Sequence, residues 1–243
     1  LGLRAACDEI LYHDMDMAFV VGPLQDFSSL ELHAMALLGA ITFHSYNDTP
    51  EIASRPFDTK REGFVPSHGG AALVLETLEH AQRRGAKIYA ELLAIDANSD
   101  ASHLPQPSEE GQTRLSQRVL KAANLAPEQI DFVSTHATST PLGDIIEARS
   151  IQSVFGAHAH NGLKINAPKS MLGHTCWAAP AVETVAAILQ MNAGKLHPST
   201  NIDEIDPEID LDVCANTAVN HEVNYFMKNW FGFGGINSIA VWK

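Results

Sequence analysis

Short apolar runs alternate with amphipathic stretches along most of the chain. Runs of strand length occur at 15–21, 70–78, 89–97, 131–135 and 163–167, and a last strand is expected to close the chain within 231–242. Helical spacing and cap residues predict helices at 1–13, 28–38, 79–84, 113–124, 143–155 and 178–191, with a short helical turn from Pro127. Elements that alternate in this order predict an α/β fold.

Two segments add detail to this pattern. Residues 98–112 are rich in Ser, Pro, Asp and Gln, which predicts a surface connection between two lobes, residues 1–100 and residues 101–243. The helix at 178–191 carries Ala, Val, Ile and Leu on nearly every face, so it is predicted to be buried all round.

Composition narrows the class of protein. The chain has 243 residues, 45% of them hydrophobic, which suits a large core and excludes a disordered chain. A net charge of −13 argues against nucleic acid as a partner, and an acidic protein partner is open only if the few basic residues cluster on one rim. No apolar run reaches the roughly 18 residues of a membrane helix, and the first residues lack a signal-peptide pattern. Cys7, Cys176 and Cys214 lack metal-type spacing and favour reduced thiols, so we expect a soluble cytoplasmic protein without membrane contact.

Two histidines occupy unusual positions. His136 follows a predicted strand and precedes a polar turn, which is where sites of α/β proteins lie. His174 precedes the apolar helix, whose positive end favours a neutral imidazole that donates a hydrogen bond. Each alone fits a structural role, a satisfied turn histidine and a helix cap. As a pair they predict two imidazoles that converge on one oxygen.

The segment 229–237 is rich in glycine. Such a loop lets a backbone N–H approach a ligand and suits an oxyanion donor, whereas the alternative is a tight turn before an edge strand. It lacks the lysine and Ser/Thr of a phosphate-binding loop. His158 and His160 are weak metal candidates because no carboxylate or cysteine accompanies them, so no metal is expected.

Four motifs in this order resemble those of β-ketoacyl synthases, the condensing enzymes of fatty-acid and polyketide assembly. They are 57–65 with 69–76, 136–144, 169–174 and 229–237. The resemblance implies a thiolase-like α/β/α/β/α layered fold, incomplete at the N-terminus here, and usually a homodimer. It also implies that the nucleophile, Cys or Ser, precedes Leu1, and that Cys7 is not its equivalent.

The resemblance also assigns roles. His136 and His174 match the catalytic histidines, and Lys169 matches the nearby active-site lysine. Phe233 matches a gating phenylalanine whose N–H, in a loop with Gly234, belongs to the oxyanion hole; core packing is its alternative role. Residues expected to bind substrate are Thr138, Thr140 and Phe231. No cofactor is implied beyond the phosphopantetheine of an acyl carrier protein, which is the expected partner together with the N-terminal portion of the synthase.

Several positions depart from the family pattern. His68 stands where a carboxylate is expected to pair with Lys169, so a different environment is predicted for that lysine. Further changes predict a reshaped acyl pocket, at Ala137, Cys176, Trp177, Pro180 and Trp230.

Three activities fit this sequence. The leading hypothesis is decarboxylation of malonyl-carrier protein through the histidine pair, and the alternative is full decarboxylative condensation. The third is a non-catalytic partner similar to chain-length factors, which the two histidines argue against. A chain that lacks the preceding strands is expected to expose its core face and to be insoluble when it is expressed alone.

Overall fold

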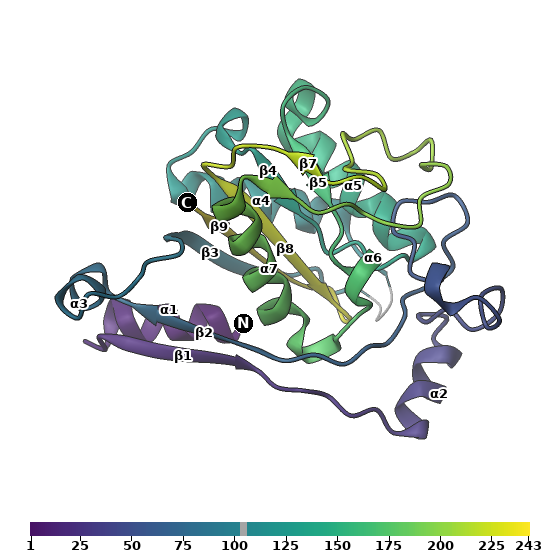
Figure 1. Cartoon of the computed structure of the whole chain (residues 1–243), viewed down its shortest axis with the longest axis horizontal. Helices are drawn as coiled ribbons and strands as arrows, with labels where there is room; N and C mark the ends of the chain where they lie inside the picture. The colour runs from purple at the N-terminus through teal and green to yellow at the C-terminus, as the bar shows by residue number, and fades with distance from the viewer. Residues whose placement is uncertain (103–105) are drawn as a thin grey trace.

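The largest sheet has five strands and forms the centre of the fold. The computed structural model describes residues 1–102 and 106–243 (Figure 1). The strand order is β3-β9-β8-β4-β5, with bounds Leu92–Ser99 (β3), Phe132–Ser134 (β4), Lys164–Asn166 (β5), Phe226–Gly232 (β8) and Ile236–Trp242 (β9). β4 runs parallel to β5 and β8, whereas β9 runs antiparallel to β3 and β8. The sheet is therefore mixed.

Helices cover both faces of this sheet. On one face lie α4 (Glu109–Ala123) and α5 (Pro141–Phe155), and on the other lie α1 (Gly2–Tyr12) and α7 (Ala179–Ala193). Alternate residues of β8 point to the two faces, because side chains alternate along a strand. Met227 packs in the cluster that holds residues of α4 and α5, whereas Phe226 and Trp230 pack in the cluster that holds residues of α1 and α7. Both faces of the sheet are thus buried.

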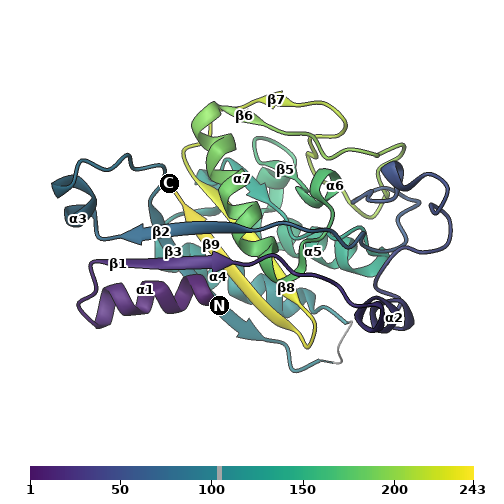
Figure 2. The same cartoon turned by 60° about the horizontal axis from the view of Figure 1, so that its bottom comes forward.

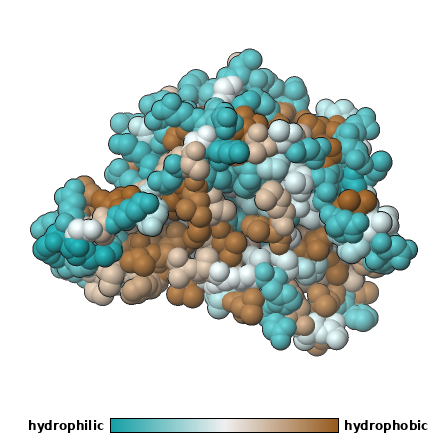
Figure 3. Space-filling view, in the orientation of Figure 1, coloured by the Kyte–Doolittle hydropathy of each residue, from teal (hydrophilic) through white to brown (hydrophobic). Residues whose placement is uncertain are grey.

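A second sheet lies beyond α1 and α7. It consists of β1 (Met17–Gly22) and β2 (Ala71–Glu76), which pair antiparallel across six residues each (Figure 2). Val20 and Leu73 pack inward, while Phe19 on the outer face is 65% exposed, next to exposed Val21 and Val74. Figure 3 shows hydrophobic surface gathered over the part of the molecule where α1, β1 and β2 lie in Figure 1.

The described residues therefore form four layers, two of helices and two of sheets. The expected fifth layer, helices over the outer face of β1 and β2, is absent from the described part of the chain, which leaves that face uncovered. No helix among residues 1–102 and 106–243 is long and apolar enough to cross a membrane.

The other elements are short. α2 begins after Ser28, whose hydroxyl accepts the Glu31 N–H while the Glu31 carboxylate accepts the Ser28 N–H, a reciprocal cap. The remaining helices and strands are α2 (Ser29–Leu37), α3 (Leu78–Arg83), α6 (Lys169–Leu172), β6 (Lys195–Leu196) and β7 (Val219–Asn220). Short 3₁₀ helices span Pro50–Ile52, Pro127–Gln129, Gly156–Ala159 and Cys176–Ala178.

The sequence predictions agree with most of these bounds, but they omit the short elements α6, β6 and β7 and differ from the structure in three further places. α4 begins at Glu109 rather than at residue 113, because Ser108 caps it within the predicted connection 98–112, of which 103–105 lie outside the described residues. α7 is not buried all round, since Leu189 is 53% exposed. β8 was not predicted as a strand. The division into two lobes at residue 100 stays a prediction. β3, which precedes residue 100, pairs with β9 in the five-stranded sheet, whose other strands all follow residue 100.

Candidate functional site

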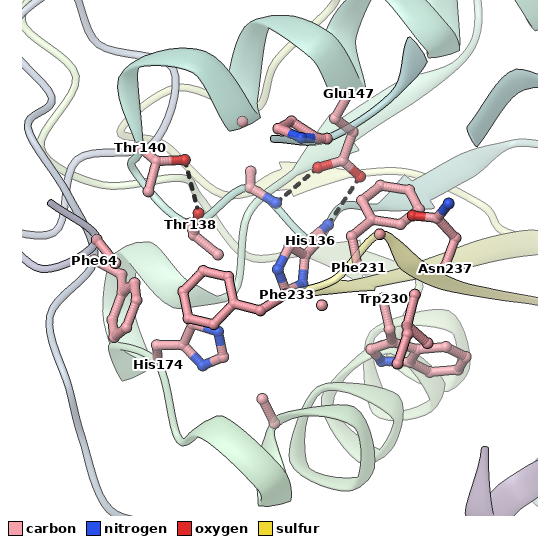
Figure 4. A pocket seen from close by; sticks show the side chains of 18 of the residues that line it. Phe64, His136, Thr138, Thr140, Glu147, His174, Trp230, Phe231, Phe233 and Asn237 are labelled. Carbon is pink, nitrogen blue, oxygen red and sulfur yellow. Dashed lines mark hydrogen bonds between the residues drawn. The ribbon is translucent and has the colours of Figure 1, made fainter. Parts of the chain in front are cut away.

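The candidate site is a pocket at the ends of β4 and β8. It has a volume of about 670 Å³. His136 and His174 both line it, together with most of the other predicted site residues: Thr138, Thr140, Phe231 and Phe233 (Figure 4). The fold thus brings together side chains that are almost 100 positions apart in the chain.

The His136 backbone and ring are held from two sides. Glu147 on α5 accepts the N–H groups of His136 (2.9 Å) and Ala137 (2.7 Å). Lys169 Nζ donates to the carbonyl oxygen of His136 (2.7 Å) and lies 3.3 Å from its Nδ1. An ammonium has only donors, so Nδ1 is the acceptor and the ring proton is on Nε2.

His174 reaches the same tautomer through the backbone. Its Nδ1 accepts the N–H of Cys176 at 2.9 Å, so its Nε2 carries the proton. Its own N–H donates to the carbonyl of Val65 at 2.7 Å, and its ring packs against Phe64 with centroids 4.8 Å apart. The histidine precedes the 3₁₀ helix that leads into α7, which is the setting that the sequence predicted.

The two imidazoles meet edge to face. Their centroids are 5.6 Å apart and their planes are inclined by 82°. Burial and, to a smaller extent, the positive charge of Lys169 lower the pKa of His174 to about 3 and the pKa of His136 well below 6.5. Both rings are therefore neutral near pH 7, and each has an Nε2–H for which the described residues supply no acceptor. The pair can donate two hydrogen bonds to one oxygen.

Lys169 does not line the pocket. It is 1% exposed, and its Nζ lies 2.6 Å from Glu183 Oε1 on α7. The environment predicted from His68 was wrong. His68 is exposed and lies 3.8 Å from Asp26, and the partner of Lys169 comes instead from the middle of the apolar helix.

The turn after His136 is fixed by buried polar groups. Asp144 accepts the N–H groups of Ser139 (3.1 Å), which has a positive φ, and of Phe57 (3.0 Å). Burial raises the pKa of Asp144 to about 7, although the nearby Arg61 charge opposes the rise. Arg61 donates to the carbonyl oxygens of Thr140 and Pro141 and binds Asp206 at 2.8 Å. This network holds the turn that carries Thr138 and Thr140, whose hydroxyl oxygens lie 3.1 Å apart.

The glycine-rich segment forms the tight connection between β8 and β9. Gly234 (φ 81°) and Gly235 (φ 71°) both adopt left-handed conformations, which favour glycine. A Cβ on Gly235 would lie 2.7 Å from Cβ of Asp100. Phe233 is 45% exposed and lines the pocket, so it does not pack in the core, whereas Gly234 makes the turn without lining the pocket.

The comparisons with known proteins identify the family. Residues 1–81 match the model "Beta-ketoacyl synthase, N-terminal domain", and residues 89–203 match "Beta-ketoacyl synthase, C-terminal domain". The chain belongs to the β-ketoacyl synthase family. Its fold is thiolase-like.

Curated relatives of the chain are named as 3-oxoacyl-[acyl-carrier-protein] synthases. The chain is 39% identical to 3-oxoacyl-[acyl-carrier-protein] synthase 2 of Coxiella burnetii over 96% of its own length and 56% of the relative's. It is also 39% identical to the chloroplastic 3-oxoacyl-[acyl-carrier-protein] synthase I of Arabidopsis thaliana, over 98% of the chain and 50% of the relative. The chain thus spans about half the length of these curated relatives.

Solved ketosynthases have the same fold. A type II polyketide ketosynthase in complex with its acyl-carrier protein superposes with a TM-score of 0.95 at 33% identity, covering 100% of this chain and 59% of that one. A β-ketoacyl synthase from Burkholderia phymatum gives a TM-score of 0.93 at 33% identity, covering 100% and 58%.

The sequence analysis missed three buried charged residues that surround this site. They are Glu147, Glu183 and Lys228. The signal was a charge inside an apolar element, Glu183 in α7 and Lys228 in β8. The structure also places the weak metal candidates elsewhere: His158 Nε2 lies 2.8 Å from the carbonyl oxygen of Ile130, and His160 pairs with Asp210. No group of His, Cys, Asp or Glu among the described residues could hold a metal ion.

Proposed function

We propose that the complete protein is a ketosynthase that extends an acyl chain by decarboxylative condensation of a malonyl group, and that this segment supplies the decarboxylation and oxyanion groups. The observation that carries the proposal is the pair of neutral imidazoles, each with its Nε2–H available toward the pocket. Relatives named as 3-oxoacyl-[acyl-carrier-protein] synthases favour condensation over decarboxylation alone.

The chemistry follows from where negative charge develops. The two Nε2–H groups bind the thioester carbonyl oxygen of a malonyl group. When the bond to the carboxylate breaks, carbon dioxide leaves and the electron pair forms an enolate whose charge lies on that oxygen. Each positioned donor to such an oxygen is worth about 3 kcal/mol, so two donors lower this barrier substantially.

The second step forms the carbon–carbon bond. The enolate carbon attacks the carbonyl carbon of the acyl group held on the nucleophile in a segment that precedes Leu1. A Cys holds this acyl group as a thioester and leaves as the thiolate, whereas a Ser holds it as an oxygen ester and leaves as the alkoxide. The backbone N–H of Phe233 is a donor for the oxyanion of this step, and the exposed Phe233 ring gates the pocket. Thr138, Thr140 and Phe231, which line the same pocket, contact the substrate.

The proposal includes the partners and the setting. The substrate arrives on the phosphopantetheine of an acyl carrier protein, and no other cofactor is needed. Support for this partner comes from the superposed type II polyketide ketosynthase, which is bound to its own acyl-carrier protein. The protein acts as a homodimer in the cytoplasm.

The test uses the complete protein with malonyl-carrier protein and an acyl donor. We expect release of carbon dioxide and a 3-ketoacyl product by mass spectrometry. His136→Ala and His174→Ala should each slow decarboxylation by about 10²–10³-fold, because each removes one donor to the enolate oxygen. His33→Ala, which removes an exposed histidine of α2, is the matched control.

The products separate the candidate activities. Acetyl-carrier protein without a ketoacyl product would replace condensation by decarboxylation alone. Neither product without a second subunit would indicate a partner similar to chain-length factors. Unchanged turnover in both histidine variants would refute the role of the pair.

A further inference from the structure

A second buried lysine lies behind the histidine pair. Lys228, in the middle of β8, is 0% exposed. Its Nζ lies 2.8 Å from Glu183 Oε2 and donates to the carbonyl oxygens of Ser134 (3.2 Å), Thr135 (2.8 Å) and Asn229 (3.1 Å). Four acceptors surround an ammonium that has no contact with solvent, so its position is fixed.

These contacts connect the elements that carry the site. Ser134 and Thr135 are the last residues before His136, so Lys228 holds the end of β4 from which that histidine projects. Glu183 belongs to α7, which follows His174, and β8 leads into the glycine-rich turn. One side chain thus links both histidines and the oxyanion loop.

The buried charges around the pair balance only when Lys228 is charged. Lys169 and Lys228 share the two oxygens of Glu183. Glu147 accepts three N–H groups, from His136, Ala137 and Asn229, and no described cation lies within ion-pair distance of it. Two lysines and two glutamates give zero net charge. Without the Lys228 charge the same set would be net negative beside the oxygen where the proposed reaction develops negative charge.

We propose that Lys228 is a positioning residue for the histidine pair, which fixes the strand end below His136 and supplies the positive charge that balances Glu147 and Glu183. The inference rests on the proposed function, because it concerns the anion that the pair stabilises. The charge of Lys228 matters because the protein interior has a low dielectric constant. There an unbalanced buried charge acts on the enolate far more strongly than it would in water.

The arrangement predicts that activity falls at alkaline pH, when Lys228 loses its charge. Burial lowers the pKa of Lys228 to about 8, although Glu183 opposes the shift. Above that pH the ammonium loses its proton and the buried set becomes net negative. The charged and titratable groups that face Lys228 are Glu183 of α7, Lys169 of α6, Glu147 of α5, and the histidines His136, His174 and His197.

The first experiment measures carbon dioxide release by the complete protein between about pH 6 and 10. The wild type should lose activity above about pH 8. Lys228→Met removes the charge and keeps the length, so it should be about tenfold or more slower at pH 7 and should lack this decline. Lys228→Arg keeps a charge that does not titrate, so it should recover activity relative to Lys228→Met and shift the decline upward. Lys164→Met, at a partly exposed lysine of β5, is the matched control.

The second measurement does not need activity. Lys228 lowers the pKa of both histidines, so Lys228→Met should raise the pH at which the imidazole NMR signals of His136 and His174 titrate. The inference is overturned if Lys228→Met keeps the alkaline decline, if its rate at pH 7 is within about twofold of the wild type, or if the histidine titrations are unchanged. A wild type that releases no carbon dioxide would refute the proposed function alone, and the NMR titration would still decide the inference.

Discussion

Acid should destabilise this protein through His174. Folding holds the pKa of this imidazole at about 3, whereas the usual value is 6.5. Below that usual value the unfolded chain binds a proton that the folded protein does not bind. The unfolded state therefore gains relative stability as the pH falls, and the stability conferred by a neutral His174 is complete only above about pH 7.

The size of the effect follows from the two values. Between pH 8 and pH 5 an imidazole with these pKa values lowers the free energy of unfolding by about 2 kcal/mol. His174→Asn removes the imidazole and with it this contribution. The variant is expected to be less stable than the wild type at pH 8, and the difference should shrink by about 2 kcal/mol at pH 5.

The assay is urea unfolding of the complete protein at both pH values, followed by circular dichroism. His33→Asn, which changes an exposed histidine of α2, controls for the loss of an imidazole. NMR of the imidazole nitrogens gives an independent readout, since the wild type should show a neutral His174 with the proton on Nε2 at pH 5. A stability difference that stays constant from pH 8 to pH 5, or a His174 signal that titrates near pH 6.5, would refute the reasoning.

Three further predictions concern the framework of the site. Arg61→Met should cost about 3–5 kcal/mol of unfolding free energy because it breaks buried ion pairs, whereas Arg149→Met, at an exposed pair, should cost under about 1 kcal/mol, both measured by chemical denaturation. Gly63→Ala should lower the melting temperature more than Gly85→Ala: both glycines have a positive φ, so both changes strain the backbone, but only at Gly63 would a Cβ also lie 2.5 Å from a backbone carbon, that of Ile41; equal shifts would contradict this steric account. Phe19→Lys, on the uncovered face of β1, should raise the fraction of this segment that stays in solution when it is expressed alone, measured by comparing soluble and pelleted protein, and an unchanged soluble fraction would show that another surface is responsible.

Local signals in the sequence predicted most helices and strands. Ser28 and Glu31 form the cap of α2, and Pro127 opens the expected short helical turn, because these signals act over a few residues. β8 escaped prediction for the opposite reason. Lys228 and Asn229 interrupt its apolar pattern, and a sequence pattern treats such residues as exposed.

The residues of the site also fall into a group that local sequence signals predicted and a group that they did not. The histidines and the glycine-rich turn were found from their settings beside predicted elements. The acids that surround them were not, because Glu183 and Glu147 are defined by tertiary contacts, and the partners of Glu147 lie 10 to 82 positions away in the chain. Glu183 lies 45 positions from Lys228, and only the folded structure brings the two together. The same limit explains the wrong environment assigned to Lys169.

The tautomers of the two histidines differ in how they can be altered. His174 depends on a backbone N–H, that of Cys176, so ordinary side-chain substitution at Cys176 leaves its donor in place and only proline would remove it. His136 depends on the side chain of Lys169, which a single codon change can delete. Engineering can therefore tune one imidazole while the other keeps its orientation. Of the two histidines, His136 is therefore the one whose tautomer a side-chain mutation can readily change.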